Sequence, residues 1–212
     1  MIMVWLMIKK ENIIELLNLL DYSKENENFY SKRFDDDIIK VDITNENIIY
    51  PDNLDVNGGT TSNFENAENF VVFECVNRLL SRGYKAKNMV LEPRWKIGRG
   101  ASGGKADILI KDNQNHEYLI IECKTYGSEF DKAWDKTKSD GDQLFSYAQQ
   151  IKRTQYLCLY ASNIQNSKII YSNKIITVKD NEEYLKTLSP NKKKRFKEAS
   201  DVKEFPNSIF SN

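Results

Sequence analysis

The chain has 212 residues, of which 40% are hydrophobic and 29% are charged. This length is enough for one globular domain with a real core plus additional segments, and the composition excludes a disordered tail. Lysine and arginine together number 31, as do aspartate and glutamate. The net charge therefore gives no sign of nucleic-acid binding, although a neutral protein can still concentrate positive charge locally.

The three cysteines, Cys75, Cys123 and Cys158, include no Cys-x-x-Cys pair. An odd number of widely spaced cysteines argues against a disulfide framework and against a structural zinc site. Residues 1–8 are apolar but too few to cross a bilayer, and they lack the basic start and the cleavage site of a signal peptide. We therefore expect a cytoplasmic protein with no membrane partner, whose first residues form a strand or a turn.

Residues 1–60 are expected to form an accessory segment. Apolar residues at helical spacing predict a helix over 11–20, and the polar stretch 24–37 is expected to be a loop. Residues 38–50 are typical of two short strands around Asn45-Glu46-Asn47.

The segment 61–162 is expected to have the order helix, three strands, helix, strand. A helix is predicted over 62–82, with Ser62 and Glu65 as a capping box and Gly83 at its end. The later predicted elements are a strand at 90–97, a glycine-rich loop at 98–104, strands at 105–111 and 117–124, a helix at 140–152 and a strand at 155–160.

The last segment, 163–212, is expected to be an extension or a linker. It contains a predicted hairpin at 168–178, turning around Ser172-Asn173, and a basic stretch at 192–197. The whole pattern predicts an α/β fold with a mixed central sheet flanked by helices.

Two carboxylates stand on predicted strands that are otherwise apolar. Asp107 lies in KADILIK, and Glu122 lies near the end of EYLIIECK. A buried carboxylate is costly without a cation or a hydrogen-bond partner, and two on neighbouring strands repel each other. A hard divalent cation such as Mg²⁺ removes both penalties, because it prefers carboxylate oxygens and keeps several waters.

Lys124 follows Glu122 by two residues, which places both side chains on one face of a strand. Its ammonium can then reach the volume of the metal, orient the attacking water and stabilise charge on a phosphate. Cys123 points to the other face, but its carbonyl oxygen can still complete the metal shell.

Asp107 followed by Glu122-Cys123-Lys124 after a short hairpin resembles the motif of the PD-(D/E)XK nuclease superfamily. The order of predicted elements is similar to the core of that superfamily, and Gln143 and Tyr147 resemble its Q-x-x-x-Y element. That element occurs in the nuclease domain of type I restriction enzyme R subunits and in RecB-like nucleases. The likeness covers roughly residues 62–161, and Ala106 stands where the motif's name expects proline.

The resemblance implies a restriction-endonuclease-like core, a DNA substrate, a Mg²⁺ cofactor for which Mn²⁺ can substitute, and an aligning role for Gln143. It also implies a metal-binding glutamate on the first core helix, for which Glu65, Glu68 and Glu74 compete. At about 100° per residue, Glu68 falls within the apolar stripe of this helix, whereas Glu74 lies off it and Glu65 suits the cap. We therefore choose Glu68, although a second apolar face on the helix leaves the alternatives open.

Basic and hydroxyl side chains precede the acidic residues and can hold phosphates along a groove. The candidates for DNA contacts are Arg94, Lys96, Arg99, Ser102, Lys105 and, from the later helix, Tyr147. A solvated loop and a tyrosine packed in the core would explain the same residues.

Other hydrolase and motor sites are excluded. His116 is the only histidine and falls in an asparagine-rich turn, so a histidine-based hydrolase is not expected. Gly104-Lys105 does not continue as a P-loop, because Ala106 replaces serine or threonine and a strand follows.

The sequence thus predicts a Mg²⁺-dependent DNA endonuclease with Glu68, Asp107, Glu122, Lys124 and Gln143 at its centre, and with Glu68, Asp107, Glu122 and Cys123 as metal ligands. By analogy, motor, methyltransferase or specificity subunits of a restriction system would be its partners. Two alternatives remain open: a nuclease-fold module that binds DNA or assembles a complex without cutting, and a nuclease of DNA repair or junction resolution.

Overall fold

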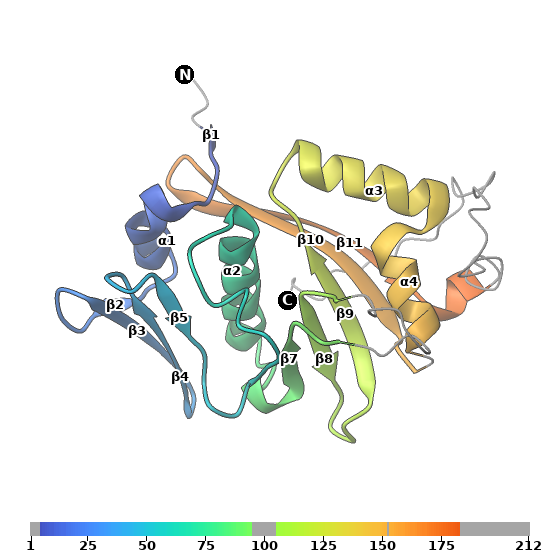
Figure 1. Cartoon of the computed structure of the whole chain (residues 1–212), viewed down its shortest axis with the longest axis horizontal. Coiled ribbons are helices and arrows are strands. Elements are labelled where there is room, and N and C mark those ends of the chain that lie inside the picture. The colour runs from blue at the N-terminus through green and yellow to red at the C-terminus, as the bar shows by residue number, and fades with distance from the viewer. Residues whose placement is uncertain (1–4, 95–104, 152, 183–212) are drawn as a thin grey trace.

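A computed structural model of the chain describes residues 5–94, 105–151 and 153–182 (Figure 1). Within this part, the protein is a mixed α/β structure with two β-sheets and four α-helices, as the composition and the pattern predicted. Residues 1–4, 95–104, 152 and 183–212, which include the predicted glycine-rich loop and the basic stretch at 192–197, lie outside the described residues.

The described elements follow in chain order. The α-helices are α1 (Ile13–Leu19), α2 (Ala67–Ser81), α3 (Ser128–Asp140) and α4 (Asp142–Gln150), with short 3-10 helices at Lys10–Asn12, Ala86–Asn88 and Lys179–Asn181. The strands are β1 (Trp5–Leu6), β2 (Ser23–Lys24), β3 (Phe29–Phe34), β4 (Asp37–Asp42), β5 (Asn47–Ile49), β6 (Asp55–Val56), β7 (Met89–Leu91), β8 (Ile108–Lys111), β9 (Glu117–Cys123), β10 (Tyr156–Gln165) and β11 (Lys168–Thr177).

The larger sheet has the order β1-β10-β9-β8-β7-β6, and β11 pairs with β10. β8 lies antiparallel to both β7 and β9, whereas β10 lies parallel to β9. The sheet is therefore mixed, as expected. It takes strands from all three segments of the predicted organisation, because β1 and β6 come from residues 1–60 and β11 from the last segment.

The two faces of this sheet bury different sets of side chains. Ile108, Ile110 and Ile121 pack with α1, α2 and the smaller sheet in one hydrophobic cluster. Leu109 and Ile120 alternate with them and pack with α3 and α4 in a second cluster. Successive strand residues point to opposite faces, so this alternation decides which side chains reach α4. Figure 1 shows α2 between the smaller sheet and the strands β7–β10.

The smaller sheet, in the order β2-β3-β4-β5, corrects one prediction and confirms another. β4 and β5 are antiparallel strands around the expected turn. The predicted loop at 24–37 is wrong, because residues 29–34 form β3 and pair along β4. Only Tyr30 of β3 is buried, so its sequence FYSKRF carries little of the apolar alternation that marks a strand.

The first core helix begins later than predicted. α2 starts at Ala67 with Asn66 as its N-cap, so the capping box of Ser62 and Glu65 is wrong. Residues before it are held in extended contacts: the Ser62 carbonyl accepts the Ile48 N–H at 2.8 Å, and Asn63 forms a β-bridge with Asn47. These contacts with a strand distant in sequence replace the local cap.

Two further boundaries differ from the predictions. The hairpin does not turn at Ser172-Asn173, because residues 168–177 form one continuous strand paired along β10. Its turn is Asn166-Ser167, where both residues have positive φ angles of 50° and 54°. Helix α4 begins at Asp142, and α3, which was not predicted, precedes it. A signal for α3 was present, since Phe130, Ala133, Trp134 and Thr137 are buried at helical spacing.

Candidate active site

Asp107 and Glu122 come from neighbouring strands of the larger sheet. Ile108 pairs with Ile121, and the same register continued by one residue brings Asp107 beside Glu122. Both continue the alternation of Leu109 and Ile120, which places them on the face covered by α3 and α4. The Cys123 backbone N–H donates to Asp107 Oδ2 at 2.7 Å and fixes this carboxylate just before the start of β8.

Lys124 lies just beyond β9 on the same face as Glu122. Its Nζ is 2.8 Å from Glu122 Oε1 and 3.3 Å from Glu68 Oε1, so the ammonium bridges a strand carboxylate and a helix carboxylate. The Lys124 N–H donates to the Tyr160 carbonyl on β10 at 2.8 Å, which extends the parallel pairing past the end of β9. The face-sharing of Glu122 and Lys124 predicted from strand alternation is confirmed.

Tyr147 of α4 supports this arrangement from inside the protein. Its side chain is buried, and its hydroxyl lies 2.7 Å from the Lys105 carbonyl oxygen and 3.2 Å from Glu122 Oε2. The hydroxyl therefore links the residue two positions before Asp107 to the second carboxylate. Tyr147, which was also a candidate for a DNA contact, is only 2% exposed and so does not lie on the surface of the protein.

A cavity of about 410 Å³ lies beside Asp107 and Glu68. Its lining contains carboxylates, hydroxyls, amides and one ammonium, so it is strongly polar. The lining residues are Thr60, Thr61, Asn66, Ala67, Glu68, Asn69, Lys105, Asp107, Thr125 and Glu129. Asp107 and Glu68 thus meet in one hollow, at the point where β8 begins and α2 begins.

The buried carboxyl groups have perturbed acidities. Burial raises the pKa of Asp107 well above its ordinary value, and the charge of Glu122 raises it further. Burial also raises the pKa of Glu122, against the opposing charge and hydrogen bond of Lys124. Burial alone would lower the pKa of Lys124, but Glu122, Glu68 and Asp107 together raise it, so the ammonium keeps its proton. Both carboxyl groups therefore resist ionisation, although one ammonium lies beside them. A further cation in the site would stabilise their ionised forms.

The donors suit a hard divalent cation. Within residues 5–94, 105–151 and 153–182, no three carboxylate, imidazole or thiol side chains converge closely enough to hold an ion by themselves. The Lys124 ammonium bridges Glu68 and Glu122 instead. Asp107, Glu122 and the Cys123 carbonyl are oxygen donors of the kind that Mg²⁺ accepts while it keeps its remaining waters. The Cys123 thiol is buried, and the Cys123 carbonyl is the only part of this residue suited to the ion.

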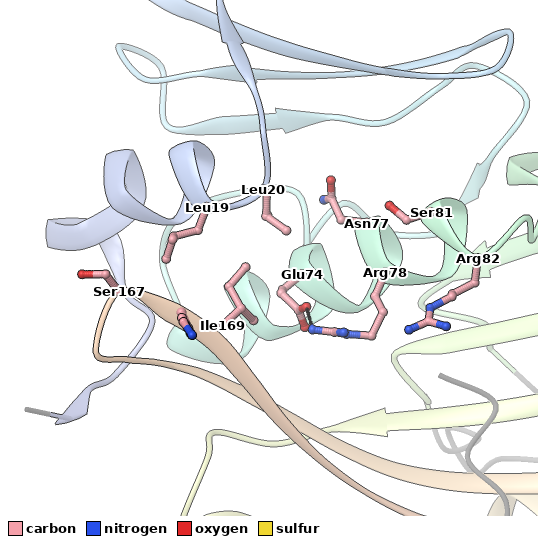
Figure 2. Close-up of a pocket in the computed structure, with 10 residues that line it drawn as sticks. Leu19, Leu20, Glu74, Asn77, Arg78, Ser81, Arg82, Ser167 and Ile169 are labelled. Atoms are coloured by element: carbon pink, nitrogen blue, oxygen red, sulfur yellow. Dashed lines mark hydrogen bonds and ion pairs between the residues drawn. The ribbon is translucent and has the colours of Figure 1, made fainter. Parts of the chain in front are cut away.

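The three competing glutamates of the first core helix are placed in different surroundings. Glu68 lines the cavity and contacts Lys124, whereas Glu65 is exposed ahead of the helix. Glu74 is buried elsewhere: its carboxylate lies 2.6 Å from Arg78 and accepts the Tyr160 hydroxyl at 2.6 Å. Figure 2 shows Glu74 directed at Arg78 in a separate cavity of about 460 Å³ beside α1 and the β10–β11 turn.

The remaining predicted residues divide into three groups. Lys105 lines the cavity, and Arg94 is exposed and forms a β-bridge with it. Gln143 is exposed at the start of α4 and makes no side-chain hydrogen bond in the described part of the chain. Lys96, Arg99 and Ser102 lie outside the described residues.

Sequence reasoning missed Glu92, which stands directly after β7. This residue has no exposed surface, and its Oε2 lies 2.7 Å from the Lys105 ammonium. Its partners are 31 and 13 positions away in the chain, so no local pattern marks them. The one available signal was a charged residue between a buried apolar strand and the basic stretch that starts at Arg94.

No family model matches this chain, and no curated protein sequence matches it. Among the described helices, none is both long enough and apolar enough to pass through a membrane.

Proposed function

We propose that this chain hydrolyses phosphodiester bonds of DNA in a reaction that depends on Mg²⁺, with Mn²⁺ as a substitute. The proposal includes a restriction-endonuclease-like core of the PD-(D/E)XK type. It is supported by the resemblance of Asp107, Glu122 and Lys124 to that motif, and by the placement of the strands β7, β8 and β9 between α2 and α3 in chain order.

One observation carries the proposal: Lys124, Glu122 and Asp107 share one face and one end of two adjacent strands, beside a polar cavity. An isolated ion pair would explain Lys124 and Glu122 alone. It would not explain Asp107, whose carboxylate is held by a backbone N–H next to a second buried carboxylate. An isolated ion pair would also leave the polar cavity beside Asp107 unexplained.

The roles of the residues follow from their positions. The carboxylates of Asp107 and Glu122 and the Cys123 carbonyl would hold the cation, with Glu68 at the rim. When bound, the cation would supply an acidified water and neutralise charge on the scissile phosphate. Lys124, fixed as an ammonium, would orient that water and donate to a phosphate oxygen as charge develops. Lys105 would contact a phosphate at the cavity wall, and the resemblance implies that Gln143 aligns the site once DNA is bound.

The cellular setting is part of the proposal by analogy only. The resemblance to nuclease domains of type I restriction enzymes suggests a cytoplasmic restriction system, in which a motor, methyltransferase or specificity subunit would deliver the DNA.

Cleavage assays test the proposal. Purified protein is incubated with linear, circular, single-stranded and branched DNA in Mg²⁺, in Mn²⁺ and in EDTA. We expect cleavage of at least one substrate with either metal, none in EDTA, and none by Asp107→Ala. Wild-type protein that binds DNA but leaves every substrate intact would support a binding module instead, and a preference for branched DNA would favour junction resolution.

A further inference from the structure

Glu92 combines three costly features at the edge of the candidate active site. Its carboxylate is fully buried, and its backbone has a positive φ of 54°, a region that residues other than glycine rarely adopt. Its carboxylate also fills the space that a side chain at position 58 would need, because a Cβ added to Gly58 would lie 2.2 Å from Glu92 Oε2. Outliers of this kind persist where the surrounding structure fixes them, and they cluster at functional sites.

Each oxygen of the Glu92 carboxylate has its own partner. Oε1 accepts the Thr61 N–H at 2.7 Å and the Thr61 hydroxyl at 3.1 Å, so it ties down the segment that leads into α2. Oε2 lies 2.7 Å from Lys105 Nζ, and that ammonium also donates to the Thr60 hydroxyl. Both threonines and Lys105 line the cavity, whereas Glu92 lies behind them.

The backbone around this pair is joined to the proposed catalytic residues. The Glu92 N–H donates to the Asp107 carbonyl at 2.9 Å, and the Lys105 carbonyl is 2.7 Å from the Tyr147 hydroxyl. Lys105 is thus fixed at both ends, by its carbonyl toward Glu122 and by its ammonium toward Glu92. About a third of its side chain, 31%, stays exposed to the cavity.

We propose that Glu92 is a positioning residue, which holds the Lys105 ammonium in the cavity wall so that it binds a phosphate oxygen of the DNA near the scissile bond. This inference rests on the proposed function. A free lysine would sample many rotamers, whereas one held by a buried carboxylate meets the phosphate without that loss of entropy. The two ammonium groups are held by different partners: Lys124 by Glu122 and Glu68, and Lys105 by Glu92 and Thr60.

A stabilising role alone does not account for this arrangement. A buried ion pair is often no more stabilising than well-packed apolar residues of similar volume, and the positive φ adds a further cost. The exposed ammonium at the end of the network is the one part that can meet a ligand. A positioning role therefore explains why a costly pair stands beside the cavity.

The substitution Glu92→Gln tests the proposal, because glutamine keeps the acceptor for Thr61 but loses the charge that holds Lys105. We expect kcat to fall by about 10-fold. DNA affinity measured in Ca²⁺ should stay within about twofold or become tighter, since a negative charge is removed. Metal-induced thermal stabilisation should not change. Glu27→Gln, at an exposed position in the β2–β3 turn, is the matched control and should behave as wild type.

Two further variants separate positioning from simple stabilisation. Gly58→Ala displaces the Glu92 carboxylate without removing it, so it should also lower kcat. Lys105→Met should lower kcat, and adding Glu92→Gln to it should cause no further loss beyond about twofold, because both changes remove one function. Should Glu92→Gln fail to fold, Gly58→Ala and Lys105→Met decide the question.

The outcomes are distinct. Wild-type cleavage together with full kcat in Glu92→Gln or in Gly58→Ala would overturn the role of Glu92 and leave the proposed function standing. Losses that multiply in the double variant would overturn it as well, since they would show two independent effects. Absence of cleavage by the wild type on every substrate would contradict the proposed function, and the role of Glu92 would fall with it.

Discussion

The Lys124 ammonium lies 2.8 Å from the Glu122 carboxylate, two residues earlier on the same strand face. It also reaches Glu68 on α2, which lines the cavity, so one cation joins the sheet to the helix. In the proposed reaction a metal ion would take over part of this neutralising role, which frees the ammonium for water and phosphate. Several measurable consequences depend on that exchange.

Divalent metal should stabilise the protein, and Asp107→Asn should remove that effect. Ligand binding to the folded state adds about 2.7 kcal/mol to the free energy of unfolding when free metal is about 100 times Kd. In EDTA, Asp107→Asn should instead be more stable than wild type by about 1 kcal/mol, because it removes a buried charge beside Glu122. Asparagine can still accept the Cys123 N–H. Thermal melts of both proteins with and without Mn²⁺ measure these differences. A metal-induced rise in Tm that persists in Asp107→Asn would contradict the role of Asp107 as a metal ligand.

The stability of the metal-free protein should depend on pH in a defined direction. Burial and the charge of Glu122 raise the pKa of Asp107, so the folded state keeps its proton to a higher pH than the unfolded state does. The stabilisation is complete below the ordinary carboxyl pKa, about pH 4, and is lost as pH rises through the raised value. Urea unfolding in EDTA at increasing pH should show this decline in the wild type. Asp107→Asn should give a flatter profile, and an equal slope in both proteins would be inconsistent with the assignment.

Removing the Tyr147 hydroxyl should loosen Glu122 without emptying the core. Tyr147→Phe deletes the contacts to the Lys105 carbonyl and to Glu122 Oε2 but keeps the ring. The free energy of unfolding should fall by about 1 kcal/mol, typical of one hydrogen bond, and the cleavage rate should fall several-fold. Tyr84→Phe, three residues after the last residue of α2, is the control for loss of a tyrosine hydroxyl. Equal cleavage by the two variants would show that Tyr147 only packs.

Glycine substitutions locate the β10–β11 turn experimentally. Ser167 has a φ of 54°, so Ser167→Gly relieves an unfavourable conformation and should stabilise the protein by about 0.5 kcal/mol. Ser172 lies within β11 opposite Ala161, so Ser172→Gly should destabilise it by about 1 kcal/mol. Denaturant unfolding of the pair measures both signs. Destabilisation by Ser167→Gly together with stabilisation by Ser172→Gly would contradict this placement and favour a turn at Ser172-Asn173.

Features that depend on residues close together in the chain could be predicted from the sequence. The side-by-side placement of Glu122 and Lys124 follows from the two-residue period of a strand, and this relationship could be predicted. The choice of Glu68 over Glu74 came from helical phase, which put Glu68 in the apolar stripe and Glu74 off it. The structure does not bear out that reason, because Glu74 is buried against Arg78 whereas the Glu68 side chain is 44% exposed, although Glu68 does line the cavity. The catalytic roles of these residues remain predictions.

The features that escaped prediction are set by contacts between distant parts of the chain. Residues 62 and 63 were predicted to start the first helix, but they contact β5 while the preceding Thr61 is bound by Glu92, and no capping pattern encodes these contacts. Glu92 itself is defined by Thr61, Lys105 and the space left at Gly58, all from other segments. Strand β3 was missed because only one of its six residues, Tyr30, is buried, so its sequence lacks a marked apolar alternation. The turn at Asn166-Ser167 was missed because Ser172-Asn173 offered an equally polar pair.

The most direct test of the metal-dependent site is a paired measurement on Lys124→Gln. Because the ammonium competes with the metal for Glu122, the variant should bind Mn²⁺ at least as tightly as the wild type in titration calorimetry, while DNA cleavage falls by about 100-fold or more. Wild-type protein that binds no divalent ion, or a Lys124→Gln variant that cleaves DNA at the wild-type rate, would contradict the account.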